Sequence, residues 1–265
     1  MEVYLSGLLH AAAACKCYNR DPGQLLNNYR MYKGVTAMYG KKIVVKPHSF
    51  HGCELELMMR PPAQSDIPAI VAGLQYEPVT RGTLMLGSPD EAFEEKWLER
   101  TSQDKDSVHW VVEVNGECIA LTGINFKGGK FIGTGTTGKI NFAPQKYWGK
   151  RIATVTDMVR TWYGWYQHGL TRYTSEVFTT NPGSWKSLLK SGYYFTGVHS
   201  CAVWSQGTFN SEYLFEWTRP DHAGERSLQE FDLPWMDKEA YRRHVREQQE
   251  RAALVLKYVP DFIVL

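Results

Sequence analysis

The chain has 265 residues, of which 43% are hydrophobic and 13% aromatic, so it can bury a sizeable core without disulfide bonds. Lysine and arginine total 30 against 28 aspartate and glutamate residues, and a formal net charge of +2 argues against a nucleic-acid or anionic membrane partner. No apolar run approaches the ~20 residues of a membrane span, and the five cysteines fit reduced thiols, so we expect a cytoplasmic protein.

The residue patterns divide the chain into three parts. Residues 1–53 have weak periodicity broken by turn-forming residues, and we expect an N-terminal extension there. Residues 54–218 alternate strand and helix patterns and are expected to form the main domain. Residues 219–265 begin with a polar stretch and continue into a charged helix from about Asp237 to Lys257. We expect this C-terminal arm to pack on the domain, with self-association as an alternative.

Two helices are expected before the central strands. A strand that includes Leu57 ends at the Arg-Pro-Pro run of residues 60–62, and Ser65 or Asp66 can cap the helix that follows. Residues 88–91 read Ser-Pro-Asp-Glu, a capping box with proline at the first helical position. The box predicts a second helix with its N-cap at the serine.

Three antiparallel strands are expected next. Residues 109–114 and 117–126 flank Asn115-Gly116, a dipeptide that readily adopts the positive φ angles of a type I′ turn. The Lys-Gly-Gly-Lys run of residues 127–130 then turns the chain into a third strand that reaches about Phe142. These strands are expected to form the centre of the sheet.

Two further motifs are weighed and set aside. Residues 133–140 nearly spell a phosphate-binding P-loop, but Ile140 replaces the magnesium-binding serine or threonine and Pro144 follows soon after. We therefore expect a glycine-rich strand there. Cys15 and Cys17 lack the spacing of a zinc site, and no second cysteine pair exists in the sequence, so we expect no metal.

The second half of the domain continues the alternation. A helical pattern covers about residues 152–169, a strand pattern residues 171–178 and a short helix residues 182–190. A hairpin from 198 to 217, turning near Gly207, completes the order β-α-α-β-β-β-α-β-α-β-β. The fold class expected from this order is α/β.

Two ordered motifs resemble a known family. Residues 144–154, PQKYWGKRIAT, resemble the acyl-CoA loop of the RimJ/RimL-like branch of the GNAT acetyltransferases. Residues 181–193, NPGSWKSLLKSGY, resemble the Asn-x-x-Ser helix of that branch, and residues 57–66 are similar to its first strand and RPxxxxD segment. Gly197 is similar to the glycine that opens the family's last hairpin. The resemblance implies a GNAT-like mixed, mostly antiparallel sheet with flanking helices, splayed at the acyl-CoA site.

Acyl transfer from a thioester needs an anion site for the pyrophosphate of the cosubstrate and an oriented carbonyl group. A helix start offers free N–H groups and a positive dipole end. The resemblance implies acetyl-CoA as cosubstrate, and Lys186 is a further candidate for its phosphates. The expected acetyl-CoA contacts are Ile140, Asn141, Phe142, Lys146, Tyr147, Trp148, Gly149, Lys150, Arg151, Ile152, Ala153, Asn181 and Lys186.

The departing thiolate needs a proton, and the attacking amine must lose one. The resemblance implies that Asn181 and Ser184 lie near the thioester sulfur, and Ser184 is the candidate acid, acting directly or through water. Glu176 is the candidate base, although Glu113, Glu212 and a water chain are alternatives.

Two positions depart from the family pattern. Arg151 stands where the family loop usually has a second glycine, so its side chain must point away from the phosphate cradle or contact phosphate itself. Leu188 stands where many GNAT enzymes have a tyrosine that acts as general acid, although the RimJ/RimL-like branch commonly lacks it too.

The resemblance implies an N-acetyltransferase that moves an acetyl group directly to a primary amine, and we expect the acceptor to be a small molecule. A protein or peptide N-terminus is an alternative acceptor, and a longer acyl group is an alternative donor. A module that binds acyl-CoA or acts as a scaffold without catalysis is the rival from another class, favoured by the two departures alone.

Overall fold

The computed structural model describes residues 40–83, 89–126, 133–205, 207–220 and 237–265. Its strands are β1 (Ile43–Val45), β2 (Leu57–Arg60), β3 (Ser107–Val114), β4 (Glu117–Asn125), β5 (Thr134–Asn141), β6 (Arg172–Phe178), β7 (Tyr194–Ser205), β8 (Thr208–Thr218) and β9 (Ile263–Val264). Its α-helices are α3 (Ile67–Gln75), α4 (Glu77–Thr83), α5 (Glu91–Gln103), α6 (Ile152–His168), α7 (Pro182–Lys190) and α9 (Lys238–Phe262). Two 3-10 turns, η3 (Gln64–Asp66) and η4 (Gln145–Tyr147), precede α3 and α6.

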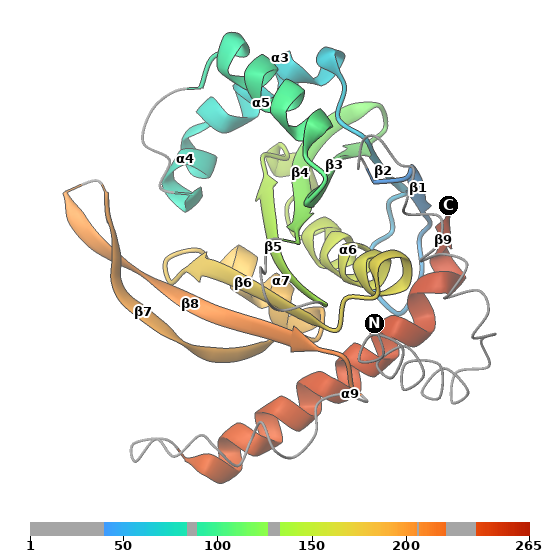
Figure 1. The fold of residues 1–265 in the computed structure, drawn as a ribbon, viewed down its shortest axis with the longest axis vertical. Coiled ribbons are helices and arrows are strands. Elements are labelled where there is room, and N and C mark those ends of the chain that lie inside the picture. Colours follow the sequence, from blue (N-terminus) through green and yellow to red (C-terminus); the bar gives the residue numbers. More distant parts are fainter. Residues whose placement is uncertain (1–39, 84–88, 127–132, 206, 221–236) are drawn as a thin grey trace, which may run out of the picture. The chain divides into compact units, whose positions relative to one another are not determined.

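All of these strands belong to one sheet, in the order β7-β8-β6-β5-β4-β3-β2-β1-β9 (Figure 1). Every neighbouring pair is antiparallel except β5 and β6, which run parallel. The fold is therefore the expected α/β class with a mixed, mostly antiparallel sheet.

Helices cover both faces of the sheet because its central strands bury both sets of side chains. Successive residues of a strand point to opposite faces. Trp110 of β3 accordingly packs in the core cluster that contains Val155 and Val159 of α6. The next residue, Val111, packs in a second cluster with Ile70 of α3.

Several local signals produce the expected elements. Asn115 and Gly116 have φ angles of 51° and 80°, so the β3–β4 hairpin turns as predicted. Helix α6 ends at His168, and the next residue, Gly169, has a φ of 67° and forms the left-handed C-cap that glycine favours. The glycine-rich segment from Thr134 to Asn141 is strand β5, as expected, rather than a P-loop.

The start of α5 differs from the expectation. Its N-cap is Asp90, whose carboxylate accepts a hydrogen bond from the Phe93 amide at 2.8 Å, and Glu91 is the first helical residue. Ser88 lies outside the described residues. The expected N-cap at the serine was therefore wrong: aspartate caps a helix as well as serine does, and Asp90 lies two residues further along the chain.

Two short strands were not predicted. Strand β1 pairs antiparallel with β2 and with β9, where Val44 lies opposite Val264. Strands of three and two residues are too short to show an alternating pattern. Their pairing brings residues from both expected extensions into the sheet, while the division of the chain at residues 53 and 219 stays a prediction.

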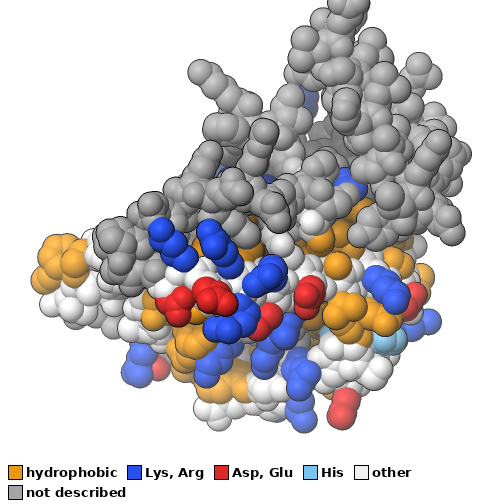
Figure 2. All heavy atoms as spheres, turned by 90° about the horizontal axis from the view of Figure 1, so that it is seen from below, with side chains coloured by type: hydrophobic (Ala, Val, Ile, Leu, Met, Phe, Trp, Pro, Cys, Tyr) orange, Lys and Arg blue, Asp and Glu red, His pale blue; other side chains and the backbone are white. Residues whose placement is uncertain are grey.

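Helix α9 is longer than expected, ending at Phe262 rather than near Lys257. One side of it is buried and includes Val245, Val255 and Val259, while its charged residues face outward. Seen from below, Figure 2 shows lysine and arginine side chains interspersed with acidic ones rather than a patch of one sign. None of the helices in the described ranges is both long and apolar enough to cross a bilayer.

The sheet opens between β5 and β6. These strands pair at three positions only: Thr134 with Arg172, Gly135 with Tyr173 and Thr136 with Thr174. Beyond them β5 runs on to Asn141 and β6 to Phe178 without pairing to each other. The opening, which we call the splay, leaves one edge of β5 without a strand partner.

Candidate active site

The segment that leaves the splay forms an open turn before α6. Gly149 has a φ of 75°, and a Cβ atom added there would meet nothing within 4 Å. No side chain caps the start of α6, so the amides of Ile152, Ala153 and Thr154 have no partner within the helix. Free amides at a helix N-terminus bind anions. The splay therefore ends beside a site that fits a phosphate or pyrophosphate group.

The side chain of Arg151 reaches the turn that follows β1. Its Nη1 donates a hydrogen bond to the carbonyl oxygen of His51 at 3.4 Å, and a Cβ atom on Gly52 would lie 2.9 Å from the same nitrogen. Arg151 has a φ of 62°, the left-handed conformation that glycine adopts freely. The backbone thus keeps the shape of a glycine loop while the arginine contacts the turn after β1.

Other residues of the loop have partners of their own. Lys146 forms an ion pair with Glu117 of β4 at 2.6 Å and lies over the Tyr147 ring at 4.8 Å. The Trp148 indole donates to the Ala143 carbonyl at 2.9 Å. The side chains of Tyr147 and Ile152 are buried, whereas the exposed side chains of the loop are those of Pro144, Gln145, Lys146, Trp148, Lys150 and Arg151.

The side chains of residues 140–142, at the end of β5 and just beyond it, have contacts within the protein. Ile140 and Phe142 pack in the cluster with α3. The side chain of Asn141 accepts a hydrogen bond from the Ala143 amide at 2.9 Å. The Phe142 amide donates to the Ile119 carbonyl of β4 at 3.0 Å. Because successive strand residues direct their backbone groups to alternate sides, those of Asn141 face the β6 side and are available to an extended ligand.

Asn181 is the N-cap of α7 and links that helix to α4. Its Oδ1 accepts from the Ser184 amide at 3.2 Å, and its Nδ2 donates to the Gly82 carbonyl at 3.1 Å. Both ends of the amide are thus used to hold two helices together. The half-buried Ser184 hydroxyl has no hydrogen-bond partner among the described residues, so it is available to a ligand.

The acidic residues of β6 and β8 lie on the sheet face opposite α6. Tyr173 and Ser175 of β6 point toward α6. Glu176, the next residue after Ser175, therefore points to the other face. Glu212 lies on the same face because Glu176 is opposite Leu214 in the register. Burial, and then the negative charge of Glu176, raise the pKa of Glu212.

Glu113 is engaged elsewhere. Arg60 donates from Nε to Glu113 at 2.9 Å and holds Asp66 with both terminal nitrogens at 2.7 Å. Asp66 also accepts from the Ala63 amide at 2.8 Å. The RPxxxxD segment therefore fixes the turn between β2 and α3, and Glu113 takes part in that support.

Two remaining positions on α7 differ in their surroundings. Lys186 is exposed and its ammonium lies 5.3 Å from the centre of the Trp185 ring. Leu188 is 3% exposed and packs in the main core. A core leucine therefore occupies the position at which many GNAT enzymes have a tyrosine that acts as general acid.

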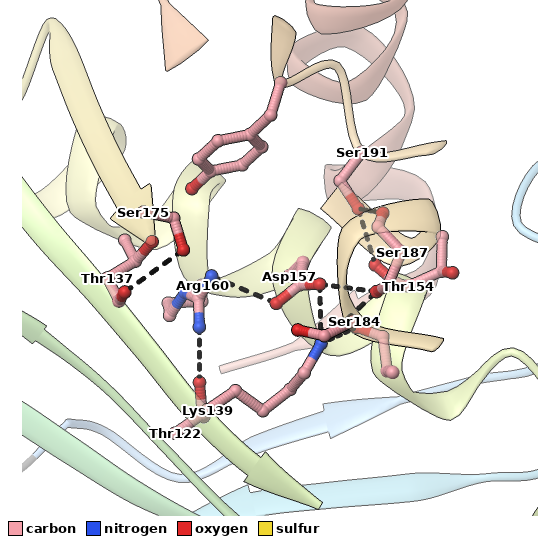
Figure 3. Close-up of polar contacts among 12 residues, drawn as sticks. Thr122, Thr137, Lys139, Thr154, Asp157, Arg160, Ser175, Ser184, Ser187 and Ser191 are labelled. Atoms are coloured by element: carbon pink, nitrogen blue, oxygen red, sulfur yellow. Dashed lines mark hydrogen bonds and ion pairs between the residues drawn. The ribbon is translucent and has the colours of Figure 1, made fainter. Parts of the chain in front are cut away.

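A buried polar cluster beside the splay was not predicted. Lys139 of β5 donates to Asp157 of α6 at 2.6 Å and to Ser187 of α7 at 3.2 Å (Figure 3). Arg160 lies 3.0 Å from the other oxygen of Asp157 and donates to Thr122 at 2.8 Å. The only sequence signal was that Asp157 and Arg160, which have opposite charges, lie three residues apart among the apolar residues of the predicted helix.

Metal ligands do not gather in the part of the chain that the structure describes. No group of three or more histidine, cysteine, aspartate or glutamate side chains is placed there to hold an ion. Cys53, Cys118 and Cys201 are free thiols. Cys15 and Cys17 lie outside the described residues.

A family model for the acetyltransferase (GNAT) domain matches residues 56–194. The chain belongs to the GNAT acetyltransferase family. The matched range contains both motifs on which the resemblance was based, residues 144–154 and residues 181–193.

Solved GNAT structures have the same fold. RimJ from Mycobacterium smegmatis, in complex with CoA-disulfide, gives a TM-score of 0.58 at 15% identity over 72% of this chain and 93% of that chain. Spermidine N-acetyltransferase from Vibrio cholerae, with CoA and spermine, gives 0.54 at 15% identity over 61% of this chain and 95% of that chain. A GNAT acetyltransferase from Bacillus anthracis gives 0.54 at 17% identity over 66% and 98%. A search of curated protein sequences finds no significant match.

Proposed function

We propose that this GNAT protein transfers an acetyl group from acetyl-CoA directly to a primary amine, and that the acceptor is a small molecule. The observation that carries the proposal is the splay between β5 and β6, which ends beside the uncapped start of α6 and the open turn at Gly149. Structures of the same fold that contain CoA or CoA-disulfide support this choice of cosubstrate.

The proposed binding mode follows the free backbone groups. The pantetheine arm, which is extended and carries amides, would pair with the edge of β5 around residues 140–142. The pyrophosphate would bind the amides of residues 152–154, where the helix dipole favours negative charge. Lys150 and Lys186 are exposed cations that would add attraction for the phosphates.

The proposed chemistry uses the two sides of the splay. Helix α7, with Ser184, lies on the α6 side of the sheet, and Glu176 lies on the other face. A neutral amine attacks the thioester carbonyl from the Glu176 side, forming a C–N bond as the C–S bond breaks. The nitrogen gives up a proton to Glu176 or water, and the thiolate takes one from Ser184 or water.

The acceptor is proposed to be cationic. Glu176 is exposed, and Glu212 has a raised pKa because of its burial and its acidic neighbour. A second positive charge on the acceptor would relieve the repulsion between these two carboxylates. A peptide N-terminus is the second candidate, because exposed Glu176 is accessible to a chain as well as to a small amine.

A free-thiol assay tests the proposal. The protein would be incubated with acetyl-CoA and polyamines, neutral monoamines or peptides with free N-termini, and product amides identified by mass spectrometry. We expect CoA release that depends on the amine and is fastest with a polyamine. Binding of acetyl-CoA without release by any amine would favour a non-catalytic module, and release only with peptides would favour the second candidate.

A further inference from the structure

Two buried cations share one carboxylate beside the splay. The side chain of Lys139 is 8% exposed, and those of Asp157 and Arg160 are each 1% exposed. Asp157 is the single acidic side chain of the described residues that forms an ion pair with either cation. If Lys139 is protonated, the cluster carries one positive charge in excess.

The hydrogen bonds of Lys139 fit the protonated form. Its Nζ has three acceptors: Asp157 Oδ2 at 2.6 Å, the Ala153 carbonyl at 3.2 Å and Ser187 Oγ at 3.2 Å. An ammonium group has three hydrogens to donate and no lone pair. The Ser187 hydroxyl donates its own hydrogen to Asp157 at 2.5 Å, which leaves its oxygen free to accept from Lys139.

Burial disfavours the protonated form of Lys139, whereas the Asp157 carboxylate favours it. Burial lowers the pKa of Lys139, Asp157 opposes that effect, and the charge of Arg160 adds to it. Arginine side chains carry their positive charge in proteins. Unpaired charge is costly in a protein interior, so an anion that arrives near the cluster is stabilised by more than it would be in water.

The cluster lies where the proposed reaction releases an anion. Lys139 is on β5 within the stretch that has lost β6 as a partner, one residue before the backbone proposed to hold the pantetheine arm. Its acceptor Ser187 is on α7, one turn beyond Ser184 (Figure 3). Side chains three residues apart on a helix are neighbours, with Cβ atoms about 5–6 Å apart.

We propose that the excess positive charge of the Lys139–Asp157–Arg160 cluster stabilises the CoA thiolate as it leaves the acetyl group. The inference rests on the placement of acyl-CoA in the splay proposed above. When the C–S bond breaks, sulfur keeps the electron pair and becomes negative, and the cluster stabilises that charge until a proton arrives from Ser184 or water. Lys139 transfers no proton in this step and acts through space.

The thiol pKa of bound CoA tests the inference without an acceptor amine. It would be measured by thiolate absorbance, with the protein's complex with desulfo-CoA subtracted to remove the protein's own cysteines. We expect the bound thiol to have a lower pKa than free CoA. Lys139→Met removes the charge but keeps most of the apolar stem. A unit positive charge a few ångströms from the sulfur should lower the thiol pKa of bound CoA by about one unit.

Lys96→Met is the matched control, because Lys96 is an exposed lysine of α5. It should leave the thiol pKa and the turnover unchanged. Lys139→Met should raise the thiol pKa by about one unit and lower kcat about tenfold, while the affinity for CoA, which depends on the phosphate site, changes less than about threefold. Lys139→Gln, which keeps a polar end, should behave like Lys139→Met.

The outcomes separate this inference from the proposed function. If wild-type protein does not bind CoA, the proposed function fails. If it binds CoA with a thiol pKa equal to or above that of free CoA, the inference is overturned whatever the variants do. If the wild-type pKa is low and a folded, CoA-binding Lys139 variant keeps it, another group is responsible and the inference is also overturned.

Discussion

Arg151 joins the start of α6 to the turn after β1, because its guanidinium donates to the carbonyl oxygen of His51 at 3.4 Å. The contact explains how an arginine is accommodated in a glycine position. Its backbone keeps a φ of 62°, and its side chain lies against Gly52, which has no Cβ atom to block it. With the Arg151 side chain held by this contact, the proposed phosphate site would consist of the backbone amides of residues 152–154 with the exposed Lys150 and Lys186 nearby.

Arg151→Ala and Arg151→Gly should separate the side-chain contact from the backbone conformation. Both lose the bond to His51, but alanine keeps the cost of a positive φ and glycine does not. We expect Arg151→Gly to be more stable than Arg151→Ala by about 0.5–1 kcal/mol in urea unfolding. Affinity for CoA should change by less than about threefold in either variant; a tenfold loss in both would show that the arginine itself binds phosphate.

The open turn at Gly149 should be sensitive to a single methyl group. Gly149→Ala strains a residue with a φ of 75° and places a Cβ atom in the space proposed for phosphate. Gly169→Ala is the control, because Gly169 at the other end of α6 has a φ of 67° and equally open surroundings. Calorimetric titration should show at least a tenfold loss of CoA affinity for Gly149→Ala alone, and equal losses in both would contradict the site.

The two candidate proton-transfer residues should affect different steps. Ser184→Ala should lower kcat about tenfold to a hundredfold while CoA affinity is kept, because it removes only the proton source for the thiolate. Unchanged turnover would remove Ser184 from the mechanism.

Glu176→Gln should lower kcat/KM for a cationic amine more than for a neutral one, because it removes both a base and a negative charge. The comparison is made with initial rates for a diamine and a monoamine of similar length. Glu56→Gln, at an exposed glutamate before β2, is the control and should leave both rates unchanged. An equal effect of Glu176→Gln on both amines would contradict a role in acceptor charge selection.

His51 should make stability depend on pH below neutrality. Burial, and then the charges of His48 and Arg151, lower its pKa from 6.5 to about 4, although a backbone contact with Lys46 opposes them. The unfolded chain therefore binds a proton between those values while the folded chain does not. The contribution of this group to stability should be constant well above pH 6.5 and fall as the pH drops toward 4, by about 3 kcal/mol.

His51→Gln should reduce that pH dependence, since glutamine has no proton to gain. Urea unfolding at intervals between pH 4 and 7.5 measures the slope, with His199→Gln, at an exposed histidine, as the control. His168, whose pKa burial also lowers to about 4, should keep part of the slope in both variants. An unchanged slope in His51→Gln would contradict the effect assigned to His51.

Local signals in the sequence predicted much of the fold, because the signals and their structural effects lie within a few residues. The Asn115-Gly116 turn and the α7 helix that begins after Asn181 are examples. The pairing of β1 with β9 could not be predicted this way, since it joins Val44 to Val264 across the whole domain.

The candidate site also combines residues that local motifs indicate with residues that only the fold brings together. The glycine loop and Ser184 are proposed from short motifs, and the left-handed φ of Arg151 follows from its position in the loop. The cluster around Lys139 depends on contacts with Asp157 and Ser187, 18 and 48 residues away in sequence. No periodicity or motif connects those residues, so only the folded arrangement brings them together.

Isothermal titration of acetyl-CoA into the purified protein measures whether the proposed site exists. We expect saturable binding at one site per chain, weakened at least tenfold by Gly149→Ala and not by Gly169→Ala. Absence of binding, or binding that Gly149→Ala leaves unchanged, would contradict an acyl-CoA site at the splay and the start of α6.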